Sequence, residues 1–191
     1  MEMEPRGRNH NAMKRLYRVC LYGPESTGKS TLARRLAEHY RTEFVPEVAR
    51  EIIISNTFTA EDIVRIGQAQ TDRVLEKSKT ANRVLFCDTD VITTAVYSDT
   101  YLHHIPPQLE ALEKKVHYDQ YFLLDIDVPW VADGLRDLGG QEQRVRMFER
   151  FKKELDRRGI PYIRLTGSYA DRERVIAQVV DEWLMNAETS A

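Results

Sequence analysis

Apolar residues along the chain gather in short runs that alternate with longer amphipathic segments. Runs rich in β-branched and aromatic residues predict five strands, at residues 17–22, 43–47, 83–88, 120–126 and 161–165. Apolar residues at helical spacing predict helices at residues 31–41, 48–55, 59–81, 90–98, 107–116, 142–158 and 169–186. Strands that alternate with helices indicate an α/β fold, in which a five-stranded parallel sheet carries helices on both faces as three α/β/α layers.

No repeat, low-complexity stretch or linker divides the 191 residues. We therefore expect a flexible N-terminal tail over residues 1–16 and a single domain over residues 17–187. Hydrophobic residues make up 42% of the chain and charged residues 30%, which is typical of a globular protein.

Charge and hydropathy exclude several classes of partner. The formal net charge is −2, so no overall field attracts the chain to nucleic acid or to an anionic membrane. There is no apolar run of transmembrane length, and the polar N-terminus does not resemble a secretory signal. Cys20 and Cys87 lie inside predicted strands without metal-ligand spacing. We expect both to be buried thiols of a cytoplasmic protein.

The segment from Gly23 to Ser30 reads G-x-x-x-x-G-K-S and joins the first predicted strand to the first predicted helix. This spacing is typical of a loop whose backbone N–H groups surround the phosphates of ATP, with further positive charge from the helix N-terminus. Lys29 is expected to reach the β- and γ-phosphates, and the Ser30 hydroxyl to bind Mg²⁺. The residues expected to bind ATP are Gly23, Glu25, Ser26, Thr27, Gly28, Lys29, Ser30 and Thr31.

Two carboxylates follow predicted strands, where ligands of parallel sheets bind. Asp88 ends an apolar strand and is our candidate for a second Mg²⁺ ligand, while Asp90 fits a helix N-cap. Glu47 follows the second strand and is our candidate for the base that takes a proton from a substrate hydroxyl. Arg50 shares its helical face, so a surface ion pair between Glu47 and Arg50 is the alternative interpretation.

The segment from Trp130 to Arg144 is the least core-like part of the chain. Its glycines and its two arginines, Arg136 and Arg144, suggest a flap that brings cations onto the phosphates and excludes water. Both arginines are therefore candidate catalytic residues, with an ordinary solvated loop as the alternative.

Four segments together resemble the ribosylnicotinamide kinase domain of NadR-type NAD-salvage proteins, over about residues 17 to 185. They are the glycine loop, E-x-x-R-E from Glu47, D-T-D from Asp88, and W-V-x-D-G-L-R-x-L-G from Trp130. The resemblance implies a P-loop kinase fold and ATP-dependent phosphorylation of the 5′-hydroxyl of nicotinamide riboside. Some family members carry an adenylyltransferase or a DNA-binding domain before the kinase domain. In this sequence about 16 residues precede the first predicted strand, so we assign neither of these activities.

Nicotinamide riboside carries a fixed positive charge on its ring, which an aromatic face and nearby carboxylates would attract. We expect Trp130, Asp90 and Asp133 to supply these groups beside Glu47 and Arg50. Alternatively, Trp130 packs under the flap and the aspartates cap helices. The expected partners are thus nicotinamide riboside or a related nucleoside, ATP and Mg²⁺, with no nucleic acid and no membrane. Two other functions fit the same motifs, namely a P-loop ATPase switch and a nucleoside kinase with another substrate.

Overall fold

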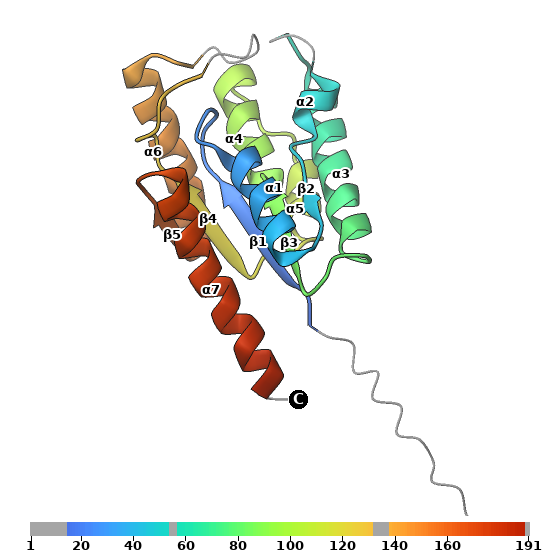
Figure 1. Cartoon of the computed structure of the whole chain (residues 1–191). Coiled ribbons are helices and arrows are strands. Elements are labelled where there is room, and N and C mark those ends of the chain that lie inside the picture. The colour runs from blue at the N-terminus through green and yellow to red at the C-terminus, as the bar shows by residue number, and fades with distance from the viewer. Residues whose placement is uncertain (1–14, 54–56, 132–137, 190–191) are drawn as a thin grey trace, which may run out of the picture.

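The computed structural model describes residues 15–53, 57–131 and 138–189 (Figure 1). Five strands form one sheet in the order β2-β3-β1-β4-β5, and every neighbouring pair is parallel. The strands are β1 (Tyr17–Tyr22), β2 (Phe44–Val45), β3 (Val84–Asp88), β4 (Gln120–Leu124) and β5 (Tyr162–Leu165). The predicted five-stranded parallel sheet is therefore confirmed.

Seven helices connect and cover these strands in the described part of the chain. They are α1 (Lys29–Tyr40), α2 (Ala49–Ile52), α3 (Ala60–Lys77), α4 (Val91–Leu102), α5 (Gln108–Glu113), α6 (Gln141–Arg158) and α7 (Tyr169–Thr189). Each lies where a helix was predicted, with shifted ends. For example, α4 continues beyond the expected Ser98, while α3 stops four residues before the expected Ala81. A capping box begins α3, because Thr59 and Asp62 exchange hydrogen bonds there.

The helices form two layers on opposite faces of the sheet. In Figure 1, α1 and α7 lie across one face, and their residues Leu36 and Ile176 join Val19 and Phe86 in one buried cluster. On the other face, α4 and α6 pack against β1 and β4 in a second cluster, while Val74 of α3 packs against β3. This three-layer arrangement buries the central strands on both sides, as expected for a parallel sheet.

The order of the strands determines where a ligand can bind. From β1 the chain passes over β3 to the edge strand β2, and it later returns to the opposite side of β1 as β4. Crevices of open parallel sheets lie beyond the carboxyl ends of strands at such a change of direction. Leu21 pairs with Asp88 in the sheet register, so the loop after β1 and the acid that ends β3 start side by side.

The described residues also show the hydropathy of the helices and the environment of the two cysteines. None of their helices combines the length and the hydropathy that a membrane span requires. Cys20 and Cys87 are buried, free and adjacent in the register of β1 and β3. Burial raises the pKa of both thiols well above the usual value, so they are packing residues here.

Candidate active site

The loop between β1 and α1 has a shape that two glycines permit. Gly23 has φ 135° and Gly28 has φ 92°, both in the left-handed region that other residues rarely adopt. A Cβ at Gly23 would lie 2.9 Å from the carbonyl oxygen of Leu124, so a side chain would also collide with β4. The hydroxyl of Thr27 donates to the carbonyl of Pro24 at 2.8 Å and fastens the loop internally. The curled backbone of a phosphate-binding loop is thus built by local contacts.

Lys29, the first residue of α1, places a positive charge inside this loop. The side chain is 7% exposed, and its Nζ donates to the carbonyl oxygens of Gly23 and Pro24, at 2.8 Å each. Burial lowers the pKa of Lys29, while the negative charges of Asp88 and Glu47 act in the opposite direction. The ammonium group therefore lies where phosphate oxygens would enter, beside the N-terminus of a 12-residue helix.

Asp88 and Ser30 lie in direct contact at the edge of the loop. The Ser30 hydroxyl donates to Oδ2 of Asp88, which is 1% exposed. The other carboxylate oxygen, Oδ1, is buried and has no hydrogen-bond partner among the residues that the structure describes. Burial, together with the charge of Glu47, raises the pKa of Asp88 to about 6, against the attraction of Lys29. This carboxylate therefore lies in a place that favours a nearby cation.

Ser30 and Asp88 fit a magnesium ion by their chemistry. Both offer hard oxygen donors, and the unpaired Oδ1 is the kind of atom that a bound cation would satisfy. In the described ranges, no group of three or more His, Cys, Asp or Glu side chains could hold a metal by itself. Magnesium commonly takes only one or two protein ligands and completes its shell with phosphates and water. The pair thus suits an ion that arrives with a nucleotide.

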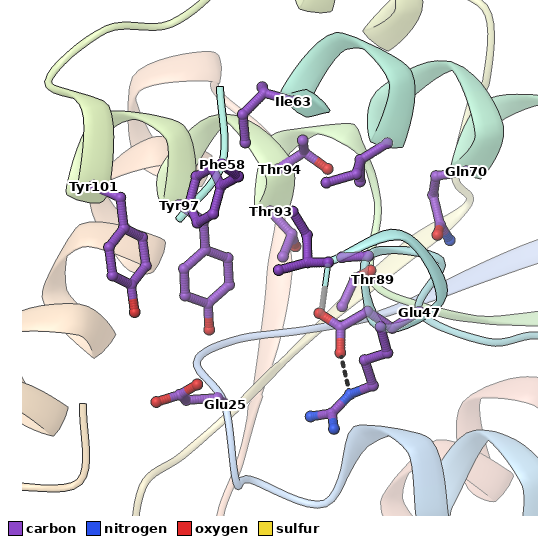
Figure 2. Close-up of a pocket in the computed structure, with 14 residues that line it drawn as sticks. Glu25, Glu47, Phe58, Ile63, Gln70, Thr89, Thr93, Thr94, Tyr97 and Tyr101 are labelled. Carbon is purple, nitrogen blue, oxygen red and sulfur yellow. Dashed lines mark hydrogen bonds and ion pairs between the residues drawn. The ribbon is translucent and has the colours of Figure 1, made fainter. Parts of the chain in front are cut away.

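A second cavity, the acceptor cavity, opens next to the loop (Figure 2). Its wall combines polar side chains with an apolar and aromatic surface from α2, α3 and α4. The lining residues are Glu25, Glu47, Ala49, Arg50, Ile53, Phe58, Ile63, Ile66, Gln70, Thr89, Thr93, Thr94, Tyr97 and Tyr101. Glu47 and Arg50 also line the cleft of the phosphate-binding loop, together with residues 26–31. The two cavities therefore share one wall.

Glu47 stands on that shared wall and is paired with Arg50. Its Oε2 accepts a hydrogen bond from Nε of Arg50 at 2.8 Å, as Figure 2 shows. The backbone N–H of the next residue, Val48, donates to Oε1 of the buried Gln70 at 3.0 Å. The surface ion pair that we considered as an alternative is therefore present, with the Arg50 side chain 40% exposed, and the same two residues also line the candidate site.

Three aromatic side chains give the acceptor cavity its apolar character. The rings of Phe58 and Tyr101 meet edge to face at 5.4 Å, and Tyr97 stacks on Tyr101 at 6.4 Å. Figure 2 shows the hydroxyl ends of both tyrosines pointing toward Glu25. Burial raises the pKa of Tyr97 well above its usual value, and the charges of Glu25 and Glu47 raise it further. The cavity is thus a place where additional negative charge is disfavoured.

The structure does not bring Asp90 to this cavity. The carboxylate is 2% exposed and caps α4, because Oδ1 accepts hydrogen bonds from the backbone N–H and the hydroxyl of Thr93. Its Oδ2 accepts from the hydroxyl of Tyr121 at 2.8 Å. Both oxygens are therefore occupied within the protein core. The helix-capping alternative describes this residue, and burial raises its pKa.

Trp130 and Arg144 contact each other, away from the lining of the acceptor cavity as far as the described residues define it. The guanidinium of Arg144 lies 6.0 Å from the centre of the Trp130 ring, and the indole also packs against Gly139. Arg144 is buried and donates to the carbonyl of Val128 at 2.8 Å. As placed, both residues fasten the segment after β4 to the start of α6. Asp133 and Arg136, the other two predictions from this segment, lie outside the described residues.

Sequence reasoning did not place Glu25 or the three rings at this cavity. Glu25 was expected to contact ATP, yet it lines the acceptor cavity and its Oε1 accepts from the backbone N–H of Leu138 at 3.1 Å. Tyr97 and Tyr101 are four residues apart on α4, a spacing that places them on one helical face. That spacing was the available signal, but the same pattern also occurs in ordinary helix cores.

Comparison with known proteins adds to this geometry. Residues 18–172 match the family described as AAA domain. The chain belongs to this AAA domain family. It is 32% identical over 153 residues to the trifunctional NAD biosynthesis/regulator protein NadR of Escherichia coli (strain K12), an alignment that covers 77% of this chain and 37% of that protein. It is 35% identical over 134 residues to NadR of Salmonella typhimurium (strain LT2), covering 66% and 32%. The chain thus spans about a third of the length of these relatives.

Solved structures show the same fold. A NadR protein in complex with NAD and AMP-PNP matches with a TM-score of 0.73 at 25% identity, covering 87% of this chain and 49% of that one. A NadR protein in complex with NR matches with a TM-score of 0.72 at 24% identity, covering 85% and 51%. Thymidylate kinase from Candida albicans matches with a TM-score of 0.62 at 11% identity, covering 88% and 92%. The resemblance to NadR-type proteins and the P-loop kinase fold are therefore confirmed.

Proposed function

We propose that this chain is an ATP- and Mg²⁺-dependent kinase that phosphorylates the 5′-hydroxyl of nicotinamide riboside, giving nicotinamide mononucleotide and ADP. One observation carries the proposal. Glu47 and Arg50 line both the cleft of the phosphate-binding loop and the acceptor cavity, so a bound triphosphate and a bound nucleoside would share this wall. Two sites in such contact suit direct transfer of a phosphoryl group.

The donor half of the reaction rests on the loop. Its N–H groups, the N-terminus of α1 and the ammonium of Lys29 would bind the β- and γ-phosphates. Ser30 and Asp88 would hold Mg²⁺, which would supply positive charge against the negative charge that develops on the phosphates. These groups act on any nucleoside triphosphate, so they account for the donor and leave the acceptor open.

The acceptor half rests on Glu47. The 5′-oxygen of the nucleoside would attack the γ-phosphorus, the bond from that phosphorus to the ADP oxygen would break, and the hydroxyl proton would pass to the Glu47 carboxylate. Arg50 supports this role because its hydrogen bond orients the carboxylate. Since the transition state of phosphoryl transfer is loose, orientation of the hydroxyl is a major part of what Glu47 would contribute.

Nicotinamide riboside suits the acceptor cavity by its charge and its planar ring. Its ring is a planar cation, and the cavity offers the rings of Phe58, Tyr97 and Tyr101 together with the carboxylates Glu25 and Glu47. The rise that both carboxylates cause in the pKa of Tyr97 supports a negative potential there. A NadR protein of the same fold is described in complex with NR, which agrees with this choice of acceptor.

The remaining predicted residues keep narrower roles in the proposal. Arg136 stays our candidate for the cation that meets the developing charge of the transferred phosphoryl group, and Asp133 stays a candidate for the acceptor site. Arg144 and Trp130 would act by holding the segment that carries them. The two free, buried cysteines are compatible with the cytoplasmic location that we propose.

The proposal is tested by measuring ADP release with and without an added nucleoside. We expect release to depend on nicotinamide riboside, with nicotinamide mononucleotide formed in equal amount by mass spectrometry. Uridine, thymidine and adenosine are the comparison acceptors. ADP release that is independent of every acceptor would contradict the kinase proposal and favour a switch ATPase. A strong preference for one of the neutral nucleosides would leave a kinase but contradict nicotinamide riboside as its acceptor.

A further inference from the structure

Arg172, in the first turn of α7, is a charged side chain with no exposed surface. Arginine is almost never completely buried unless acceptors surround its guanidinium, because removing the charge from water is costly. None of the motifs in the sequence includes this residue. Its surroundings therefore need a physical explanation.

The guanidinium of Arg172 joins three separate segments. Its Nη1 donates to the carbonyl of Thr27 in the phosphate-binding loop at 2.8 Å. Its Nη2 donates to the carbonyl of Asp125 after β4 at 3.1 Å and to the carboxylate of Asp127. Its Nε donates to the carbonyl of Gly167 in the turn before α7 at 3.1 Å. The rigid, forked donor set of arginine makes such a junction possible, and a lysine could not reproduce it.

The contact with Thr27 fixes a peptide group of the phosphate-binding loop. In a trans peptide the C=O and N–H bonds point in opposite directions. The described chain has no cis peptide bond, so holding the Thr27 carbonyl toward Arg172 turns the Gly28 N–H away from it. Gly28 lines the cleft of the loop. Arg172 thereby sets the direction of a donor that a phosphate would use.

The same guanidinium fastens the opposite wall of this cleft. Asp127 accepts from Arg172 and, through Oδ2, from the backbone N–H of Gly167 at 2.6 Å. The turn held in this way leads to Tyr169, which also lines the cleft. A Cβ on Gly28 would lie 2.5 Å from Cε1 of Tyr169, so the ring and the loop are in close contact. One buried cation thus fixes the loop relative to the turn before α7.

We propose that Arg172 is a positioning residue for the triphosphate, and that it acts through the Thr27–Gly28 peptide without touching the ligand. This inference rests on the proposed function only in that ATP is the ligand of the loop. It predicts that changes to Arg172 weaken nucleotide binding while leaving the acceptor cavity unchanged. A role limited to packing would lower stability without this selectivity.

The test is Arg172→Lys, which keeps the charge but removes the fork. AMP-PNP binding is measured by calorimetry in the presence of Mg²⁺ without any acceptor, so the result is independent of kinase activity. We expect the dissociation constant to rise at least tenfold, while the affinity for nicotinamide riboside stays within twofold. Thermal unfolding is followed in parallel. Unchanged AMP-PNP affinity in a folded Arg172→Lys protein would overturn the proposal, whatever its stability.

Arg164→Lys is the matched control. Arg164 pairs with the carboxylate of Asp125, just after β4, but its side chain is 56% exposed, and it contacts no loop residue in the described part of the chain. We expect its AMP-PNP affinity to equal that of the wild type, and a loss equal to that of Arg172→Lys would also overturn the proposal. If Arg172→Lys does not fold, Asp127→Asn carries the test, because it removes the ionic partner that orients the guanidinium. That variant should lose several-fold in AMP-PNP affinity, and no loss would contradict the inference.

Discussion

The phosphate-binding loop and the acceptor cavity lie side by side but are built in different ways. The loop is made of consecutive residues, and most of its shape comes from backbone dihedrals and hydrogen bonds that span six residues or fewer, with Arg172 of α7 holding the Thr27 carbonyl from outside. The acceptor cavity is made of side chains from positions 25 to 101, which only the folded sheet and helices bring together. One site is local in the sequence and the other depends on the whole fold.

This difference separates what is general from what is specific. Backbone N–H groups bind phosphates in the same way whatever nucleoside is phosphorylated. Side chains that lie outside the loop, such as Phe58 and Tyr97, are expected to change the choice of acceptor without affecting the loop. Substitutions in the loop should therefore reduce every reaction of the protein, whereas substitutions in the cavity should discriminate between acceptors.

The largest effect is expected for Lys29→Ala. Loss of the ammonium removes the only side-chain cation that the described loop residues direct at the phosphates, and turnover with any acceptor should fall by roughly 10³-fold. Arg34→Ala, an exposed arginine of the same helix, is the control and should keep full activity. Steady-state rates measure the turnover of both variants, and circular dichroism checks that both are folded. A Lys29→Ala protein with near wild-type turnover would show that the loop is not the donor site.

The second largest effect is expected for Asp88→Asn. Its turnover should fall by roughly 10²-fold, and the Mg²⁺ concentration needed for half-maximal rate should rise at least tenfold. The reason is that Oδ1 is the buried oxygen without a partner beside Ser30. Asp90→Asn is the control two residues away, because asparagine can still cap α4. The measurement is the rate of each variant as a function of Mg²⁺ concentration. Equal Mg²⁺ dependence in the two variants would remove Asp88 from the metal site.

For Glu47→Gln we expect turnover to fall by about 10²-fold with AMP-PNP affinity unchanged, since a general base contributes on this scale. Glu51→Gln serves as the control. Glu51 lies four residues further on, in α2, but it pairs with Arg73 and is half exposed. Calorimetry with AMP-PNP and single-turnover rates separate binding from transfer. A weaker affinity for AMP-PNP in Glu47→Gln would assign the residue to the donor site instead.

Tyr97→Leu should have the smallest effect and the most selective one. Loss of the aromatic face should raise the Michaelis constant for nicotinamide riboside by roughly fivefold to tenfold, with little change for ATP, because one cation–π contact is worth about 1 kcal/mol. Trp130→Ala, which we first expected to act in this way, should change neither constant selectively, since Trp130 packs on Arg144. The reverse ranking of these two variants would return Trp130 to the acceptor site.

The sequence predicted the sheet, the helices and the loop because each has a local signal. Glycine spacing defined the loop, and apolar runs that end in acid placed Glu47 and Asp88 at strand ends. It did not predict the lining of the acceptor cavity. Asp88 and Asp90 are two residues apart, yet Asp88 accepts a hydrogen bond from Ser30 whereas Asp90 caps α4. Only the direction of the folded backbone decides which way each carboxylate points. Arg172 gave no signal either, because its partners are the Asp127 carboxylate and three backbone carbonyls, two of which come from distant segments.

The central claim is that the side chains of the acceptor cavity select a planar cation next to a general phosphate site. The most direct measurement compares nicotinamide riboside with its reduced 1,4-dihydro form, which has nearly the same shape but no charge on the ring. With ATP and Mg²⁺ held constant, we expect kcat/KM to favour the cationic riboside by about tenfold or more, as one or two cation–π and carboxylate contacts would give. Equal kcat/KM for the two forms, or a preference for the neutral one, would contradict the account.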